Sequence, residues 1–164
     1  MTLLAVALVA AGLAYDVPGE WTSKPSSSSM RAAVWELAGD GAPAEVVIFY
    51  FGEGGGGGVE ANLDRWFGQF EQPDGSSTRD KATTTKRTVN GLELTIADIR
   101  GTYVAPVRPG AQQRNNNAGH RMIAAVVEGG AGPWYIRVIG PEATVTKWET
   151  SVDAFFASLR LESP

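Results

Sequence analysis

The 164-residue chain contains no cysteine and only one histidine, His120. The absence of cysteine excludes a disulfide framework, thiolate ligation of zinc or of an iron–sulfur cluster, and a cysteine nucleophile. A single histidine cannot form a multi-histidine metal site, and a Ser-His-Asp triad would have to be built on His120 alone. We therefore predict no metal and no cofactor, and the simplest interpretation of His120 is an exposed structural residue.

Positive charge is also scarce, with 14 lysines and arginines against 18 acidic residues and a formal net charge of −4. Proteins that bind nucleic acids usually carry a basic patch and a high pI, so we expect no nucleic-acid partner. The glycine-rich stretch lacks the Gly-Lys-Ser/Thr ending of a P-loop, and the chain lacks the Asp-x-Asp-x-Asp-Gly pattern of a calcium loop. We predict no catalytic residue from these patterns.

No basic residue precedes Lys24, and no apolar run approaches the roughly 20 residues that a membrane-spanning helix needs. Leu3 to Ala11 is a short apolar run that ends in small residues, which is typical of a signal peptide, although the positive n-region is missing. Residues 1–12 are therefore either a signal-peptide remnant, which predicts a secreted or periplasmic protein, or an N-terminal apolar segment of a cytoplasmic fold. We expect residues 13–161 to form a single domain, given the usual domain size.

The stretch from residue 46 to residue 70 combines a strand pattern, a glycine run and a helix pattern. The apolar run at 46–51 is rich in β-branched and aromatic residues, which favours a buried strand. Five consecutive glycines, Gly54–Gly58, cannot hold a regular element. The next apolar residues have helical spacing: Val59, Leu63, Trp66, Phe67 and Phe70. We predict a helix that lies on a sheet.

Other patterns complete an α+β fold. Strands are predicted at 13–17, 32–37, 83–89, 92–103, 121–128 and 134–140, and a second helix at 142–159. Asn90-Gly91 is typical of a type I′ hairpin turn. The alternation of apolar residues slips at Asp98–Ile99, which suggests a β-bulge near Asp98. The expected fold is an antiparallel sheet of about seven strands packed against two main α-helices.

The order of these elements resembles the Mog1/PsbP-like superfamily, which includes bacterial envelope relatives of the DcrB type. The similarity is carried by the Val-Pro-Gly-Glu-Trp stretch at 17–21, the helix pattern at 62–66, Val-Asn-Gly-Leu at 89–92, Gly-Pro-Trp-Tyr-Ile at 132–136 and the terminal aromatic helix. The resemblance implies an α/β/α sandwich around an antiparallel sheet, and an accessory or binding protein rather than an enzyme. It implies no functional residue, because none of these signatures is a chemical motif.

Two groups of residues are candidates for ligand binding. Gly56, Gly57 and Gly58 precede a predicted helix N-terminus, where free backbone N–H groups favour anions, although a flexible linker has the same composition. Asn62 and Arg65 lie on the polar side of that helix and could cap the loop instead.

The second group lies on the segment 104–119, about 16 residues without periodicity, a length that is often functional. Arg108 and Arg114 lie on this segment, where they could bind an acidic partner or form a solvated hairpin tip.

The leading hypothesis is a non-enzymatic secreted or envelope accessory domain that binds a protein or a small polar ligand. One alternative is a hydrolase or transferase that uses carboxylates near the Gly54–Gly58 loop. The carboxylates considered are Asp98, Glu128, Asp64 and Glu53. An isolated Asp or Glu is usually a solvated surface residue. A purely structural domain is the third hypothesis.

Overall fold

The computed structural model describes residues 8–162. In chain order the elements are β1 (Leu8–Ala10), β2 (Leu13–Tyr15), β3 (Thr22–Lys24), β4 (Arg31–Leu37), β5 (Ala44–Phe49), α1 (Gly58–Gly68), β6 (Phe70–Glu71), α2 (Thr78–Lys81), β7 (Thr83–Val89), β8 (Leu92–Tyr103), β9 (Asn117–Glu128), β10 (Trp134–Pro141), α3 (Glu142–Lys147), α4 (Glu149–Ser158) and β11 (Arg160–Leu161).

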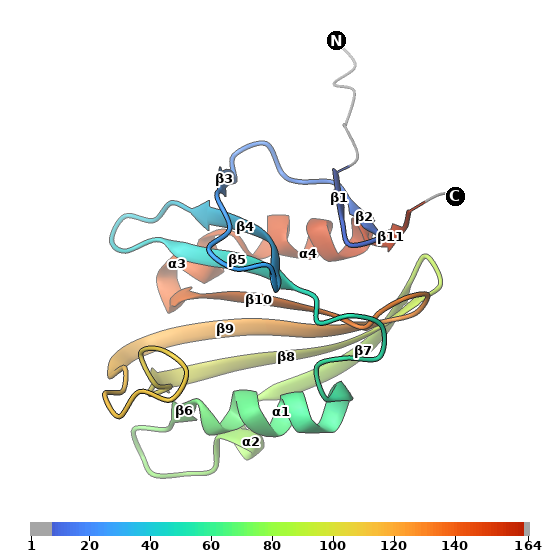
Figure 1. The fold of residues 1–164 in the computed structure, drawn as a ribbon. Helices are drawn as coiled ribbons and strands as arrows, with labels where there is room; N and C mark the ends of the chain where they lie inside the picture. The colour runs from blue at the N-terminus through green and yellow to red at the C-terminus, as the bar shows by residue number, and fades with distance from the viewer. Residues whose placement is uncertain (1–7, 163–164) are drawn as a thin grey trace.

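Most strands belong to one antiparallel sheet with the order β3-β4-β5-β10-β9-β8-β6 (Figure 1). β7 pairs with the first half of β8, and β6 pairs with the end of β8. A separate sheet of three short strands has the order β1-β2-β11. The α+β class and the antiparallel sheet are therefore as predicted. The count of about seven strands was too low for the described residues, because four strands of only two or three residues were not predicted.

Helices cover both faces of the large sheet, and Figure 1 shows α1 and α4 on opposite sides of it. On one face, Phe155 and Phe156 of α4 join a core that includes Trp35 and Ile136. On the other face, Trp66 of α1 belongs to a second core with residues of β8, β9 and β10. Trp66 is 5% exposed and Phe156 is 3% exposed. Both predicted apolar helix faces are thus buried against the sheet.

The C-terminal helix differs from the prediction. A single helix was expected over residues 142–159, but α3 ends at Lys147 and α4 begins at Glu149. Trp148 separates them: its backbone N–H donates to the Val145 carbonyl at 3.1 Å, and its indole N–H donates to the Ala38 carbonyl at 2.7 Å. Including the short α2, residues 8–162 hold four helices rather than two main ones.

Part of the apolar N-terminal run lies in the fold. Leu8–Ala10 forms β1, which pairs antiparallel with β2, and Ala10 is 5% exposed. Residues 1–7 lie outside the described part of the chain. Both interpretations of residues 1–12 therefore stay predictions.

Candidate functional site

The α1 face of the sheet is covered over only part of its width. The buried side chains of α1 pack with residues of β8, β9 and β10, among them Ile99, Ala124 and Tyr135. The neighbouring strands β5 and β4 extend beyond α1 on the same face. Two neighbouring pockets without a common lining residue lie on this part of the face, and we call them together the α1 groove. Its main residues are Arg31 of β4, Glu45 and Phe49 of β5, Arg65 of α1 and Arg137 of β10.

Strand register determines how side chains are arranged along the floor of the groove. Phe49 pairs with Tyr135, Val47 with Arg137, and Glu45 with Ile139. Alternate residues of a strand point to the same face, so these pairs form three successive rows on the α1 side. The aromatic row therefore lies directly beside the row that contains Arg137.

Two arginines share one carboxylate in the groove. Arg31 Nη1 lies 3.3 Å from Glu45 Oε1, and Arg137 Nη2 lies 3.8 Å from the same oxygen. The two guanidinium groups also lie over the ring of Phe49, at 5.5 and 5.3 Å from its centroid. Such cation–π contacts favour guanidinium next to an aromatic ring. One carboxylate leaves one of the two positive charges without compensation.

Arg137 is the least satisfied of these charges. Its side chain is 20% exposed, and its Nε is buried without a hydrogen-bond partner among the described residues. Burial lowers the pKa of Arg137 from its ordinary value, and the nearby Tyr103 and Glu45 act in the opposite direction. A buried donor without a partner costs free energy. An anion bound in the groove would remove that cost by accepting the Nε–H.

The sequence-predicted Arg65 and Asn62 both line the α1 groove, and Asn62 also holds the glycine run. Arg65 lines the same pocket as Phe49 and Arg137, and its guanidinium donates to the Asn62 side-chain oxygen. Asn62 is fully buried, and its amide donates to the carbonyls of Gly56 at 2.8 Å and Gly58 at 2.6 Å. These bonds match the capping interpretation. Whether Asn62 and Arg65 also bind a ligand stays a prediction.

The glycine run is hydrogen-bonded to the side chain of Tyr135. The Gly58 N–H donates to the Tyr135 hydroxyl at 3.2 Å, and that hydroxyl donates to the Gly55 carbonyl at 2.8 Å. Gly56 has a φ of +88°, and a Cβ there would lie 2.3 Å from the Tyr135 ring. The run is thus an ordered loop that positions the start of α1. Anion binding by Gly56, Gly57 and Gly58 stays a prediction, because part of their backbone already has partners.

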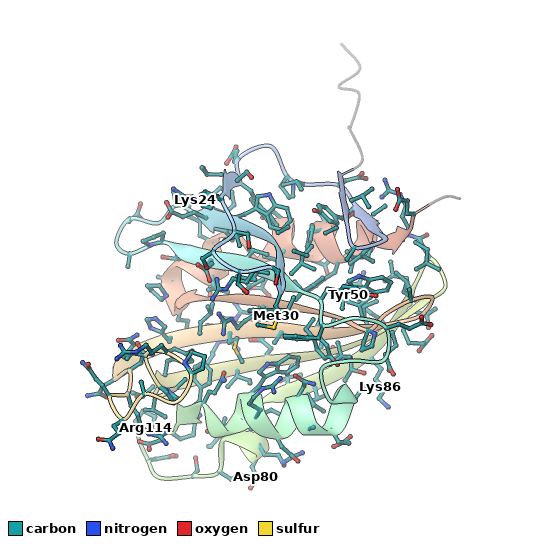
Figure 2. All side chains as sticks on the ribbon, in the orientation of Figure 1. Lys24, Met30, Tyr50, Asp80, Lys86 and Arg114 are labelled. Atoms are coloured by element: carbon teal, nitrogen blue, oxygen red, sulfur yellow. The ribbon has the colours of Figure 1, made fainter. Side chains whose placement is uncertain are left out.

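The loop with the other two predicted arginines is an ordered hairpin tip. Pro106 and Arg114 form an isolated β-bridge, and Val107 N–H donates to the Gln113 carbonyl at 3.0 Å. β9 begins at Asn117, so the end of the predicted loop belongs to a strand. Arg108 and Arg114 are exposed, and Figure 2 shows Arg114 projecting outward from the tip. Neither lines the α1 groove, and their role in binding stays a prediction.

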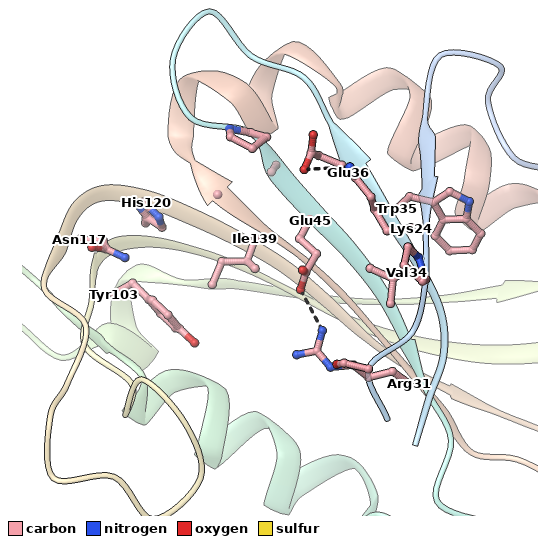
Figure 3. Close-up of a pocket in the computed structure, with 15 residues that line it drawn as sticks. Lys24, Arg31, Val34, Trp35, Glu36, Glu45, Tyr103, Asn117, His120 and Ile139 are labelled. Atoms are coloured by element: carbon pink, nitrogen blue, oxygen red, sulfur yellow. Dashed lines mark hydrogen bonds and ion pairs between the residues drawn. The ribbon is translucent and has the colours of Figure 1, made fainter. Parts of the chain in front are cut away.

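His120 and Tyr103 lie at the end of the groove next to this hairpin (Figure 3). Their rings stack with centroids 6.2 Å apart and an interplanar angle of 9°. His120 is half-buried rather than exposed, its Nδ1 has no partner among the described residues, and burial lowers its pKa. Three or more His, Cys, Asp or Glu side chains do not gather anywhere in residues 8–162 in a way that could hold a metal ion.

The candidate catalytic carboxylates are ion-paired or exposed. Asp98 pairs with Arg121 at 2.7 Å on the opposite face of the sheet, next to α3 and α4. Asp64 pairs with Arg79, while Glu53 and Glu128 are exposed. None of the four lines the α1 groove. Whether any of them takes part in hydrolysis or transfer stays a prediction.

The central residues of the groove were not predicted from the sequence. These are Arg31, Glu45, Phe49 and Arg137, joined by Gln69 and Tyr103 at one side. Arg137 had a readable signal, since it is the only charged residue inside the apolar stretch Trp134–Gly140. Glu45 and Arg31 had none, because they stand at the ends of predicted strands, where charges are common.

The comparisons with known proteins identify the fold. The structure is similar to the solution structure of cyanobacterial PsbP (CyanoP) from Synechocystis sp. PCC 6803, with a TM-score of 0.54 and 12% identity over 92% of this chain and 87% of that one. It is also similar to the crystal structure of the protein of unknown function PA94 from Pseudomonas aeruginosa, with a TM-score of 0.52 and 11% identity over 89% of this chain and all of that one. No family model and no curated protein matches the sequence. At these identities the likeness shows the fold alone, and that fold is PsbP-like, as the resemblance implied.

Proposed function

We propose that the chain is a non-enzymatic accessory domain that binds a small anionic ligand in the α1 groove. The observation that carries this proposal is the pair Arg31 and Arg137 around a single carboxylate, Glu45, with the Arg137 Nε buried and unpartnered. Arg65 adds a third guanidinium whose contact is an amide oxygen rather than a carboxylate. The groove therefore concentrates positive charge on a protein whose net charge is −4.

The chemistry of the groove supports binding rather than catalysis. Guanidinium groups are donors without an accessible neutral form and bind carboxylate or phosphate through paired hydrogen bonds. Glu45 is the groove carboxylate that contacts them, and it is occupied by both arginines. His120 lies at the far end beside Tyr103. The engagement of Glu45 by both arginines supports a binding role over that of a general base.

We further propose that the protein acts outside the cytoplasm, as a secreted or periplasmic domain. The apolar run at residues 3–11 supports this, and so does the resemblance to envelope proteins. No helix within residues 8–162 is long and apolar enough to cross a membrane. Fractionation of cells that express the full-length chain tests the proposal, and recovery of all of the protein with a cytoplasmic marker would contradict it.

The binding proposal is tested by NMR titration of the full-length, isotope-labelled protein with inorganic phosphate and with acetate. We expect saturable shifts of the Arg137 Nε–H signal and of backbone amides in β5 and β10 at millimolar anion. In Arg31→Gln these shifts should weaken, since one of two convergent guanidinium groups is removed. Arg31 is 29% exposed in its side chain, so this variant is expected to fold.

Arg114→Gln is the matched control, because it removes the same charge from an exposed position outside the groove. Shifts that disappear in Arg114→Gln but persist in Arg31→Gln would place binding on the hairpin tip instead. An absence of shifts in the wild-type protein up to saturating anion would refute anion binding altogether. Turnover of a phosphate ester or of a glycoside that is lost in Asp98→Asn, while the variant is folded, would refute the non-enzymatic assignment.

A further inference from the structure

The α1 groove consists of two compartments, and Arg137 lines the one beside α1. The compartment beside α1 has a volume of about 200 Å³, and its lining combines four aromatic rings with four polar side chains: Phe49, Phe51, Trp66 and Tyr135 with Asn62, Arg65, Gln69 and Arg137. The compartment beside β4 has a volume of about 430 Å³ and contains Arg31, Glu45 and Tyr103. Figure 3 shows the second compartment, with Tyr103 and Arg31 on different sides of Glu45. The Arg137–Glu45 contact of 3.8 Å links the two.

The first compartment has the size and shape of a site for a flat ring. A cavity of about 150 Å³ is large enough for benzene. Phe49 and Phe51 stack in parallel with centroids 6.2 Å apart, and Phe51 meets Tyr135 at 5.7 Å. Phe51 is 41% exposed although it is a large apolar residue. An aromatic ligand would cover this exposed ring and extend the stack.

Two buried polar atoms in the same compartment lack partners among residues 8–162. They are the Oε1 of Gln69, which accepts, and the Nε of Arg137, which donates. Buried polar groups in proteins are nearly always hydrogen-bonded. A ligand that supplies both an acceptor and an N–H or O–H donor would satisfy both atoms.

The register sets the spacing between ring and charge. Tyr135 and Arg137 occupy adjacent same-face positions of β10, which lie about 7 Å apart at the strand rise of about 3.3 Å per residue. A ring stacked in the aromatic row would thus place an acid group at Arg137 when one or two atoms separate the ring from the acid.

We infer that the α1 groove binds a small aromatic acid, with a ring N–H or O–H donor near Gln69 and its acid group at Arg31 and Arg137. This inference rests on the proposed anion-binding function and names its ligand class. Glu45, whose side chain is 43% exposed, occupies the position of the ligand's acid group and turns toward solvent when the ligand binds.

The test compares indole-3-acetate, indole-3-acetamide and acetate by calorimetry and NMR with the full-length protein. Indole-3-acetate is expected to bind at least about ten-fold more tightly than acetate, because only the former fills the ring compartment. The uncharged amide should also bind at least about ten-fold more weakly than indole-3-acetate. Phe51→Ala should weaken indole-3-acetate and leave acetate unchanged.

Glu45→Gln should change the affinity for indole-3-acetate in the opposite direction. Because it removes the internal competitor for both arginines, it should tighten indole-3-acetate several-fold, whereas a loss of mere structural support would weaken it. Glu128→Gln is the matched control, since Glu128 is exposed and lies outside both compartments.

Equal affinities for acetate and indole-3-acetate, with the dependence on Arg31 retained, would overturn the aromatic-acid inference and leave anion binding in place. Weaker binding in Glu45→Gln would overturn the displacement of Glu45. Failure of all three probes to bind would overturn the inference, and the phosphate titration described above then decides separately whether anion binding survives.

Discussion

Replacing Asp98 by asparagine should destabilise the protein far more than replacing Glu149 by glutamine, although both carboxylates bind the same guanidinium. Arg121 is only 1% exposed in its side chain and pairs with Asp98 through Nε at 2.9 Å and Nη2 at 2.7 Å. Glu149 makes a single contact to Nη1 at 3.1 Å. The Asp98 hydrogen bonds are the main cause that raises the pKa of Arg121. The guanidinium stays charged in both variants because arginine is protonated in proteins even without such a partner.

The loss of unfolding free energy expected for each variant follows from the exposure of the carboxylate that is replaced. Removing one partner of a buried ion pair costs about 3–5 kcal/mol, and we lower this to about 2–4 kcal/mol for Asp98→Asn, since Asp98 is 26% exposed. Glu149 is 55% exposed, so its pair resembles a surface salt bridge and Glu149→Gln should cost about 0–1 kcal/mol.

Urea denaturation measures both free energies of unfolding. Thermal melts should show a fall in Tm of about 4–16 °C for Asp98→Asn, at about 2–4 °C per kcal/mol. Equal losses in the two variants, or a larger loss for Glu149→Gln, would refute the claim that bidentate contact and burial make Asp98 the dominant partner. An active-site role for Asp98 predicts instead that Asp98→Asn keeps or gains stability.

Four further predictions concern the core, the glycine run, the groove and pH. Phe156→Ala should cost about 3–5 kcal/mol of unfolding free energy in urea denaturation, because the side chain is 3% exposed in the α4 core. Gly56→Ala should lower Tm more than Gly58→Ala: both glycines have positive φ, but only at Gly56 would a Cβ meet Tyr135, at 2.3 Å, while nothing lies within 4 Å at Gly58. Arg137→Met should change the free energy of unfolding by no more than about 1 kcal/mol. The reason is that methionine removes an unpaired buried donor and leaves behind only the half-exposed Glu45. A loss as large as that of Phe156→Ala would contradict this prediction. Burial lowers the pKa of His120 below 6.5, so the unfolded chain takes up the proton first as pH falls. The stability contributed by the neutral form is therefore complete above about pH 6.5 and is lost below it. His120→Gln should flatten this decline when urea denaturation is measured from about pH 7 to about pH 5.

The sequence carried enough information for the helices on the sheet but not for where one of them breaks. The spacing of Leu63, Trp66 and Phe67 predicted α1, because burial of an apolar stripe on a sheet decides its position. Phe70, which was assigned to the same helix, lies instead in β6, because α1 ends at Gly68 and Phe70 pairs with Tyr103 of β8. The spacing at 145–159 was equally regular, yet the chain divides at Trp148. The cause is a tertiary hydrogen bond from the Trp148 indole to Ala38, 110 positions away in sequence, which periodicity within the helix cannot encode.

The predicted bulge at Asp98 was wrong for an instructive reason. β8 pairs with β9 without interruption from Glu93 to Gly101, and its register shifts only between Gly101 and Tyr103. Leu92 and Leu94 face the α4 core, whereas Ala97 and Ile99 face the α1 core. The apolar residues change parity because the covered face of the strand changes, not because the backbone slips.

The candidate site was predictable only where it lies on a helix with a polar side. Arg65 stood out because the apolar stripe of α1 assigns it to the other side, and it lines the pocket with Phe49 and Arg137. The convergence of Arg31, Glu45 and Arg137 depends instead on the strand order β4-β5-β10. In that order β5 pairs with β10 through residues that are 86 or more positions apart in sequence, and no local pattern specifies this pairing.

The two buried arginines of the sheet show how stability and binding differ in one fold. Arg121, on the α4 face, has two carboxylates and the Thr146 hydroxyl as partners. Arg137, on the α1 face, has one distant carboxylate and an unpaired Nε. A protein that required Arg137 only for folding would gain from replacing it with an apolar residue, as is true for many poorly compensated buried charges. The satisfied arginine is therefore part of the scaffold, and the unsatisfied one is the residue to which our binding proposal assigns the acceptor of a ligand.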